Sequence, residues 1–270
     1  MMRNEQIARF SVMSLPASLC SLFAAAALAI AALMAPAVLA QGTAAKSPAE
    51  QGLDAAMVDY NAGRLSAARA GFERACDLGS SAACYSLGEM MVDGQGGAQD
   101  DVRAKALYTK ACEGDYPQGC FTLGVLLETG IGGTQDDVRA REAYSKACDG
   151  DHAEGCYIVG AMMTSARGGA QDDMGARVAF TKACHGDYAH GCLSLGVMMR
   201  FAEGGEQDEA RARALFAKAC DGDVAAGCTN LGMMMRRGEG GPVDTVQATA
   251  LFEKACELGR QRGCDLAAGL

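Results

Sequence analysis

The chain has 270 residues, 50% of them apolar by the AVILMFWYC count, and it carries a formal net charge of −9. A disordered acidic chain is excluded, because such chains lack the apolar residues that build a core. A nucleic-acid clamp is excluded as well, because 24 basic residues face 33 acidic ones and phosphate binding needs a basic excess.

The first 40 residues have the features of an export signal. Arg3 and Arg9 give a positive start, residues 19–33 form an apolar stretch rich in Ala and Leu, and residues 38–40 place small side chains where a signal peptidase needs them. We therefore predict a signal peptide over residues 1–40 and a secreted or periplasmic protein. An uncleaved membrane anchor is the alternative, because the apolar stretch is of borderline length.

Two features of the sequence argue against membrane attachment of the mature chain. Cys20 lies inside the apolar stretch and follows Leu19, which disfavours a lipoprotein. Cleavage removes two arginines and one glutamate from the 24 basic and 33 acidic residues, which leaves 22 and 32 and a net charge of −10. We expect a soluble mature protein without affinity for membranes, beginning with a disordered leader over residues 41–49.

Twelve cysteines after residue 47 recur with a fixed period. The two members of each pair are separated by seven residues, and each pair follows the previous one by 36 residues. A period in this range is typical of a solenoid built from one supersecondary unit. Each first cysteine is preceded by Ala, by a basic residue two positions back and by an aromatic residue four positions back. The pairs are Cys76 and Cys84, Cys112 and Cys120, Cys148 and Cys156, Cys184 and Cys192, Cys220 and Cys228, and Cys256 and Cys264.

Within each unit the apolar spacing predicts two antiparallel helices. In the first full unit, residues 82–92 carry apolar side chains at i, i+3, i+4 and i+7 from Cys84, and Gly88 is expected to let a neighbour approach closely. A Gly-Gly segment ends this helix, and Asp100 or Asp101 is expected to cap a second helix over 102–113. The methionine and aromatic stripes are interpreted as core, since they follow helical spacing in every unit.

The elements predict an all-α solenoid of αα-hairpins, about six units cross-linked by disulfides, over residues 50–270. Stacked helix pairs form a superhelix whose concave groove suits peptides and protein surfaces. We expect a monomer. In chain order the predicted elements are a divergent hairpin over 50–78, five units at roughly 80–115, 116–151, 152–187, 188–223 and 224–259, and a terminal helix from Gln261.

The cysteines are expected to bridge neighbouring helices. Eight residues of continuous helix would separate two cysteines by about 12 Å, beyond the roughly 7 Å limit between bridged Cα atoms. A glycine-containing segment inside each pair, Gly-Asp in the four central ones, supplies the turn that closes this distance. A rival pairing across one hairpin, Cys84 with Cys112, closes a longer loop but leaves the first and last cysteines unpaired, which is rare in an exported protein. We therefore predict six local bridges.

Neither a metal nor a cofactor is predicted. The cysteine spacing differs from that of zinc knuckles, and the chain has only three histidines. His185, Asp187 and His190 share one turn and could hold a metal weakly, but a fourth ligand is not apparent, so we interpret them as solvated turn residues. The Gln-Asp-Asp runs lack the alternating oxygen ligands of a calcium loop and are interpreted as helix caps.

One motif carries a resemblance to a known family. Residues 111–125 read Ala-Cys-Glu-Gly-Asp-Tyr-Pro-Gln-Gly-Cys-Phe-Thr-Leu-Gly-Val, and after a Gly-Gly pair residues 140–148 read Ala-x-x-x-Tyr-x-Lys-Ala-Cys. This pattern resembles the Sel1-like repeat, a relative of the tetratricopeptide repeat. Its cysteine pairs make residues 53–268 similar to the secreted helical cysteine-rich proteins. The resemblance implies local disulfides, binding of partner proteins, and binding or slow hydrolysis of β-lactam antibiotics.

The residues favour a binding protein over an enzyme. Serine β-lactamases use S-x-x-K, and no serine after residue 40 is followed three positions later by lysine. A metallo-enzyme would need clustered histidines. We predict a secreted solenoid that binds a protein or peptide in its groove, with no catalytic residue assigned. The alternative is a β-lactam-binding protein or a β-lactamase that hydrolyses penicillin- or cephalosporin-type substrates.

The variable positions of the first helices suggest where a ligand would bind. These positions lie two, five and eight residues after the second cysteine of each pair, and their charged members are acidic in the early units and arginine in the late ones. This pattern predicts a groove that is negative at one end and positive at the other, suited to an extended ligand with charged ends. Solvated surface charge is the alternative interpretation. The candidate ligand-binding residues are Glu89, Glu128, Arg200, Asn230 and Arg236.

Overall fold

The computed structural model describes residues 45–269 of the chain, and the residues from Lys46 onward form one compact unit. Within the described range the fold consists of thirteen helices and contains no strand. The predicted signal peptide lies outside the described residues, and so does Cys20. No helix between residues 45 and 269 is long and apolar enough to cross a membrane.

The helices form six antiparallel hairpins, and in each we call the two members the first and the second helix. The hairpins are α2 (Pro48–Asn61) with α3 (Leu65–Asp77), α4 (Ser81–Val92) with α5 (Asp101–Glu113), α6 (Pro117–Thr129) with α7 (Asp137–Asp149), α8 (Ala153–Thr164) with α9 (Asp173–His185), α10 (Ala189–Arg200) with α11 (Glu209–Asp221), and α12 (Ala225–Arg237) with α13 (Thr245–Glu257). A last helix, α14 (Gln261–Ala268), packs on α13.

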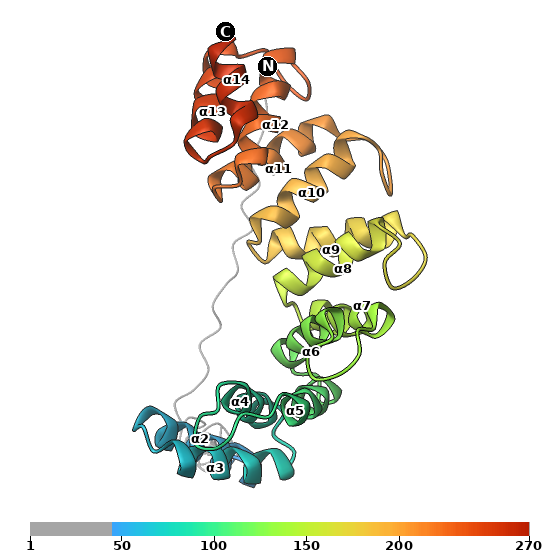
Figure 1. The fold of residues 1–270 in the computed structure, drawn as a ribbon. Coiled ribbons are helices and arrows are strands. Elements are labelled where there is room, and N and C mark those ends of the chain that lie inside the picture. The colour runs from blue at the N-terminus through green and yellow to red at the C-terminus, as the bar shows by residue number, and fades with distance from the viewer. Residues whose placement is uncertain (1–44, 270) are drawn as a thin grey trace, which may run out of the picture. The chain divides into compact units, whose positions relative to one another are not determined.

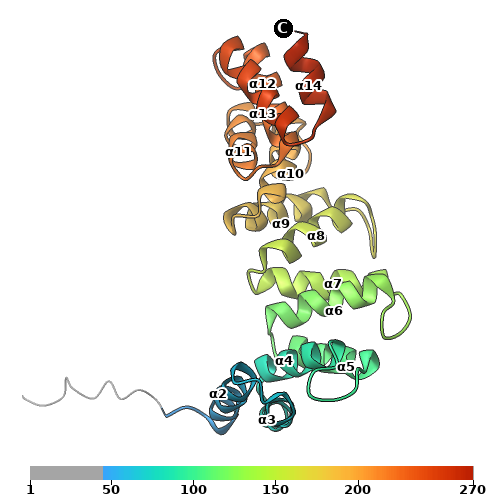
Figure 2. The same cartoon turned by 60° about the vertical axis from the view of Figure 1, so that its left-hand side comes forward.

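Successive hairpins lie against one another, so that the chain builds a stack from α2 to α14 (Figure 1). Figure 2 shows three of these hairpins, α4/α5, α6/α7 and α8/α9, as successive layers. Each second helix contacts the first helix of the next hairpin, and the core runs through the stack along these contacts. The predicted all-α hairpin solenoid of about six units is confirmed.

The stack begins slightly earlier than the sequence suggested. Ser47 caps α2 by accepting the Glu50 amide at 3.2 Å, and the Glu50 carboxylate accepts the Ser47 amide at 2.7 Å. This reciprocal pair is a capping box, and Pro48 favours the first helical position because its φ angle is already helical. The prediction of a disordered leader over residues 41–49 is therefore wrong for its last three residues.

Aspartates cap the second helices of the five 36-residue units. Asp100, rather than Asp101, is the N-cap of α5, and its carboxylate accepts the Arg103 amide at 2.9 Å. The same contact recurs at every later unit, so the Gln-Asp-Asp runs serve as caps in the way predicted. The other capping residues are Asp136, Asp172, Asp208 and Asp244.

Inside each unit an aromatic ring of the second helix lies flat on a glycine of the first. A Cβ atom at Gly124 would come within 2.7 Å of the Tyr144 ring, and Tyr144 is fully buried. The close approach predicted at Gly88 is confirmed, and what approaches is the Tyr108 ring of the same hairpin. The remaining pairs are Gly160 with Phe180, Gly196 with Phe216, and Gly232 with Phe252.

All six predicted disulfides are present, with bridged Cα atoms 4.4 to 4.7 Å apart. The rival pairing of Cys84 with Cys112 does not occur. Ten of the twelve cysteines are buried, and the two of the last bridge are partly buried. The bridges join Cys76 with Cys84, Cys112 with Cys120, Cys148 with Cys156, Cys184 with Cys192, Cys220 with Cys228, and Cys256 with Cys264.

Each disulfide joins the end of a second helix to the start of the next first helix. In the four central bridges the turn between the cysteines contains an aspartate with φ between 56° and 61°, a left-handed conformation that reverses the chain. The bridges therefore cross-link consecutive hairpins rather than the two helices of one hairpin. They are typical of a protein from an oxidising compartment.

The Gly-Gly loops attach each hairpin to the one before it. Gly168 has φ 69°, and a Cβ atom there would lie 2.2 Å from the backbone oxygen of Asp137, at the start of α7. Beside it, Arg141 of α7 donates to the Ala170 carbonyl at 2.9 Å. The same arginine-to-loop contact is made by Arg69, Arg177 and Arg213 in other hairpins.

The periodic lysine before each first cysteine has a structural role. Lys218 of α11 donates to the Cys184 carbonyl at 2.8 Å and pairs with Asp187 at 2.8 Å, both in the preceding hairpin. Lys254 repeats the contact one unit later, at 2.8 Å from the Cys220 carbonyl. The ammonium groups thus bind the carbonyl end of the previous second helix, where a positive charge is favoured.

Replacing Lys218 by Met is expected to lower the free energy of unfolding by about 1 kcal/mol, because a charged hydrogen bond between hairpins is lost from a half-exposed site. Lys146→Met is the matched control, since Lys146 has the same place in its unit but forms no hydrogen bond among the described residues. Urea titrations of both variants check the prediction. Equal destabilisation of the two would contradict it.

Candidate binding face on the first helices

Three hollows open on the surface formed by the first helices and α14, which we call the first-helix face. The early pocket lies between α2 and α4, with a volume of about 240 Å³. The middle pocket, about 350 Å³, spans α8, α10 and α12, and the arginine pocket, about 260 Å³, spans α10, α12 and α14. The last two share Val197 and Asn230 as lining residues, so they adjoin each other, and we call the two together the late trough.

The early pocket is aromatic and acidic. Tyr60 and Tyr85 stand on neighbouring first helices, and the buried Phe72 ring lies between them as a floor. Glu89 and Asp93 supply two exposed carboxylates at the carboxyl end of α4. Among residues 45–269, neither carboxylate forms a salt bridge.

The Glu89 carboxylate accepts a hydrogen bond from the hydroxyl of the buried Tyr108. Burial raises the pKa of Tyr108 well above its usual range, and the bond to Glu89 and the glutamate charge raise it further. Burial likewise raises the pKa of Tyr85, helped by the charge of Glu89. Both hydroxyls stay protonated at physiological pH, and that of Tyr108 donates to the Glu89 carboxylate.

The second predicted acidic residue, Glu128, has an internal partner. Its carboxylate accepts from the Tyr144 hydroxyl at 2.7 Å and from the Arg167 guanidinium of the following loop. Burial raises the pKa of Glu128, but the hydrogen bonds from Arg167 and Tyr144 outweigh it and hold the pKa below its ordinary value. Arg167 therefore balances the negative charge of Glu128, and the role of Glu128 in ligand binding stays a prediction.

The positive end also differs from the sequence prediction. Arg200 is largely buried, with 13% of its side chain exposed, and pairs with Glu239 at 2.7 Å. Arg236 lies over the Phe252 ring, 5.5 Å from its centroid, and lines none of the three pockets. Both arginines were predicted from their spacing from the cysteines. This spacing does not show whether a distant residue, such as Glu239 for Arg200, pairs with them.

The arginine pocket is lined by further arginines that the spacing from the cysteines did not indicate. Arg237 and Arg262 line it beside Arg200, and Glu239 is shared between Arg200 and Arg237. Among the described residues, the Arg262 guanidinium has one hydrogen bond, to the Met233 sulfur at 3.5 Å. Asn230, a predicted site residue, lies where the two late pockets meet. The late trough is therefore positive at its C-terminal end, and Glu203 places one carboxylate in the middle pocket.

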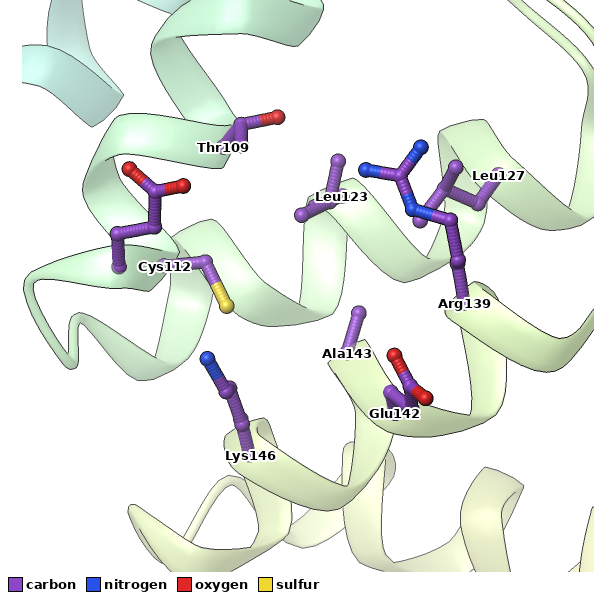
Figure 3. A pocket seen from close by; sticks show the side chains of 9 residues that line it. Thr109, Cys112, Leu123, Leu127, Arg139, Glu142, Ala143 and Lys146 are labelled. Atoms are coloured by element: carbon purple, nitrogen blue, oxygen red, sulfur yellow. The ribbon is translucent and has the colours of Figure 1, made fainter. Parts of the chain in front are cut away.

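The opposite face, formed by the second helices, has a smaller hollow of about 140 Å³ (Figure 3). Leu123 and Leu127 of α6 form its floor, while Arg139, Glu142 and Lys146 project from α7. Charges of both signs alternate around it, so it favours no charge class of ligand. This hollow offers positions for control variants.

The turn with His185, Asp187 and His190 is used for packing. Asp187 pairs with Lys218, and the His190 ring lies 6.0 Å from that of Tyr157. No group of three His, Cys, Asp or Glu side chains with the geometry to hold a metal occurs between residues 45 and 269.

His152 has a structural role at the start of α8. Its Nδ1 atom accepts the Gly155 amide at 3.1 Å, which makes it the N-cap, and its ring stacks on Phe121 with centroids 4.4 Å apart. Burial lowers the pKa of His152, against an opposing effect of Glu154. Only the neutral imidazole can accept this hydrogen bond.

Acidification is expected to weaken the His152 cap. Because its pKa is lower in the folded than in the unfolded chain, its stabilising contribution is present above about pH 6.5 and is lost as the pH falls below that value. His152→Asn keeps an N-cap that does not titrate. Between pH 7 and 5, we expect the melting temperature of the wild type to fall by more than that of this variant. Parallel curves would contradict the prediction, and His185→Asn is the control.

Five of the described serines have structural hydrogen bonds to the backbone. The hydroxyls of Ser81, Ser86 and Ser165 donate to backbone carbonyls. Ser47 and Ser80 accept backbone amides as N-caps. The contacts of these five serines are those of capping and packing, and β-lactam binding stays an untested prediction.

Antiparallel helix pairs repeated every 36 residues, with hollows along one set of helices, define a tetratricopeptide-like repeat solenoid. The family model of the Sel1 repeat matches residues 81–116, 117–152, 189–224 and 225–259, more than half of the chain. The chain belongs to the Sel1 repeat family, as the sequence motifs predicted. The unmatched residues 153–188 form a hairpin of the same kind.

Solved structures include several similar solenoids. A protective antigen of uropathogenic Escherichia coli with an SLR fold has a TM-score of 0.73 and 26% identity, over 82% of this chain and 50% of its own. A Sel1 repeat protein of Oxalobacter formigenes has a TM-score of 0.67 and 19% identity, over 81% and 87%. Cysteine-rich protein B of Helicobacter pylori is 27% identical over 49% and 95%, with a TM-score of 0.40. This chain thus spans half the length of the E. coli antigen. A search of curated proteins finds no match.

Proposed function

We propose that the protein is an exported binding scaffold whose first-helix face holds an extended segment of a partner protein. The observation that carries the proposal is the pair of adjoining pockets in the late trough, across α8, α10, α12 and α14. Hollows of about 260 and 350 Å³ in series suit successive side chains of one extended chain rather than a single compact molecule.

The lining of the trough fits this occupant. The middle pocket offers apolar contacts from Phe180, Leu193 and Met198, and Asn230 offers an amide that can both donate and accept. A peptide backbone carries donors and acceptors in alternation, so such a side chain can bind it in extended form. The six disulfides support an oxidising compartment, either the periplasm or the external medium.

A random peptide library displayed on phage tests the proposal. We expect the oxidised protein to enrich a defined sequence pattern that binds with micromolar affinity. Asn230→Phe, which fills the junction of the two late pockets, should abolish the enrichment. Thr109→Phe fills the small hollow on the second-helix face and should leave it unchanged. No enrichment, or equal enrichment by Asn230→Phe, would contradict the proposal.

A further inference from the structure

A glutamate that lines the early pocket accepts from a buried tyrosine behind it, and a similar pair occurs elsewhere in the chain. Tyr108 donates to Glu89 in the early pocket, and Tyr144, one 36-residue unit later, donates to Glu128. The two tyrosines are equivalent in the repeat, and both are fully buried. In each pair a glutamate of a first helix therefore accepts from a buried tyrosine of the second helix in the same hairpin.

The later pair is completed by a guanidinium of the chain itself. Arg167 lies 39 residues after Glu128, in the loop of the next unit, and hydrogen-bonds its carboxylate. At the equivalent loop position two units later the charges are reversed, because Glu239 of the loop pairs with Arg200 of the first helix at 2.7 Å. In both cases the loop residue neutralises a charged side chain on the first helix of the preceding hairpin.

At the early pair the chain supplies no such cation. The residue one unit before Arg167 is Ile131, which is 49% exposed and uncharged. Glu89 and Asp93 form no salt bridge within residues 45–269, although both are exposed. The early pocket therefore presents two carboxylates without an internal counter-charge.

The walls of the pocket favour a planar cation. Tyr60, Tyr85 and Phe72 present aromatic surface around a space of about 240 Å³. A guanidinium stacks on aromatic rings and pairs with a carboxylate through two parallel hydrogen bonds, whereas an ammonium is a more strongly hydrated point charge. The early pocket shares with the Arg167 site a carboxylate that accepts from a buried tyrosine, although Glu89 lies three residues before Val92, the position equivalent to Glu128.

We propose that the early pocket binds an arginine side chain of the partner segment, whose guanidinium pairs with Glu89 and stacks between Tyr60 and Tyr85. This inference rests on the proposed function for the source of the arginine. It gives the bound segment a direction, because a basic residue lies at the α2/α4 end, and acidic groups suit the arginine pocket at the α12/α14 end.

Titration of the oxidised, ¹⁵N-labelled protein with acetyl-Gly-Arg-Gly-amide tests the inference by NMR. We expect amide shift changes centred on α4, a millimolar dissociation constant, and roughly fivefold weaker binding of the matched citrulline peptide, which keeps the shape but lacks the charge. Glu89→Gln should weaken binding of the arginine peptide to a similar extent, while Glu142→Gln on the second-helix face should not. Equal binding of the citrulline or lysine peptide, or an unchanged affinity in Glu89→Gln, would overturn the inference.

This result is separable from that of the library experiment. Enriched peptides without an arginine preference, together with no shift at α4, would overturn the arginine site and leave the binding scaffold supported. Shifts at α4 with the arginine peptide, together with no library enrichment, would support the site and contradict the scaffold for extended segments.

Discussion

Reduction of all six disulfides is expected to unfold the protein at 25 °C. Each bridge closes a loop of nine residues including its cysteines, and the chain-entropy model assigns such a loop about 2.6 kcal/mol. Six such contributions total roughly 15 kcal/mol, the upper end of the net stability of ordinary domains. Far-UV circular dichroism before and after reduction with dithiothreitol and alkylation measures the loss of helix.

Single-bridge variants show whether the effect is local. Removing the central bridge with Cys148→Ala and Cys156→Ala is expected to lower the free energy of unfolding by about 2–3 kcal/mol. Removing the last bridge, between Cys256 and Cys264, should lower the free energy of unfolding by less, because only α14 lies beyond it. A fully alkylated protein with an unchanged cooperative melting curve would refute the expectation.

Gly168→Ala is expected to be one of the most damaging single substitutions in a loop. The new Cβ atom would lie 2.2 Å from the Asp137 backbone oxygen, and φ is 69°. The clash is with backbone at the start of α7, so it can be relieved only by separating the two hairpins. Together with the left-handed strain, we expect a loss of about 3 kcal/mol or more in the free energy of unfolding.

Gly133→Ala is the matched control for this substitution. Gly133 closes the preceding Gly-Gly pair, its φ is not positive, and its Cβ atom would meet only the flexible end of Lys105 at 3.0 Å. We expect Gly133→Ala to change stability by less than about 0.5 kcal/mol. Guanidinium titrations of both variants compare the two, and similar losses would show that the Gly168 contact is not what holds the hairpins together.

The repeat made most of the fold predictable. A helix pair, a cap and a cysteine pair recurring every 36 residues constrain one another, because an error in any unit would break the register of the rest. Asp100 illustrates the limit, since two adjacent aspartates are equivalent caps until the backbone shows which carboxylate faces the Arg103 amide. The start of α2 was missed because Ser47 and Glu50 lie outside the repeat.

The candidate site was less predictable for a physical reason. Position within the repeat shows which face a side chain occupies, but not whether another part of the chain neutralises it. Glu128 and Arg200 belong to the first-helix face as predicted, yet loop residues 39 positions later pair with both. Glu89 and Asn230 line the pockets. Partners contributed by loops were not visible in the spacing on which the prediction rested.

The placement of the disulfides at the joints between hairpins affects how the chain would respond to proteases. The Gly-Asp turns are exposed at residues such as Glu113 and Asp115, and each lies between two bridged cysteines, here Cys112 and Cys120. A cut in such a turn would leave both fragments covalently joined, with every helix still in its hairpin. A cut in a Gly-Gly loop would open a hairpin with no bridge across it. Resistance to digestion therefore depends on how well those loops stay attached to the preceding hairpin.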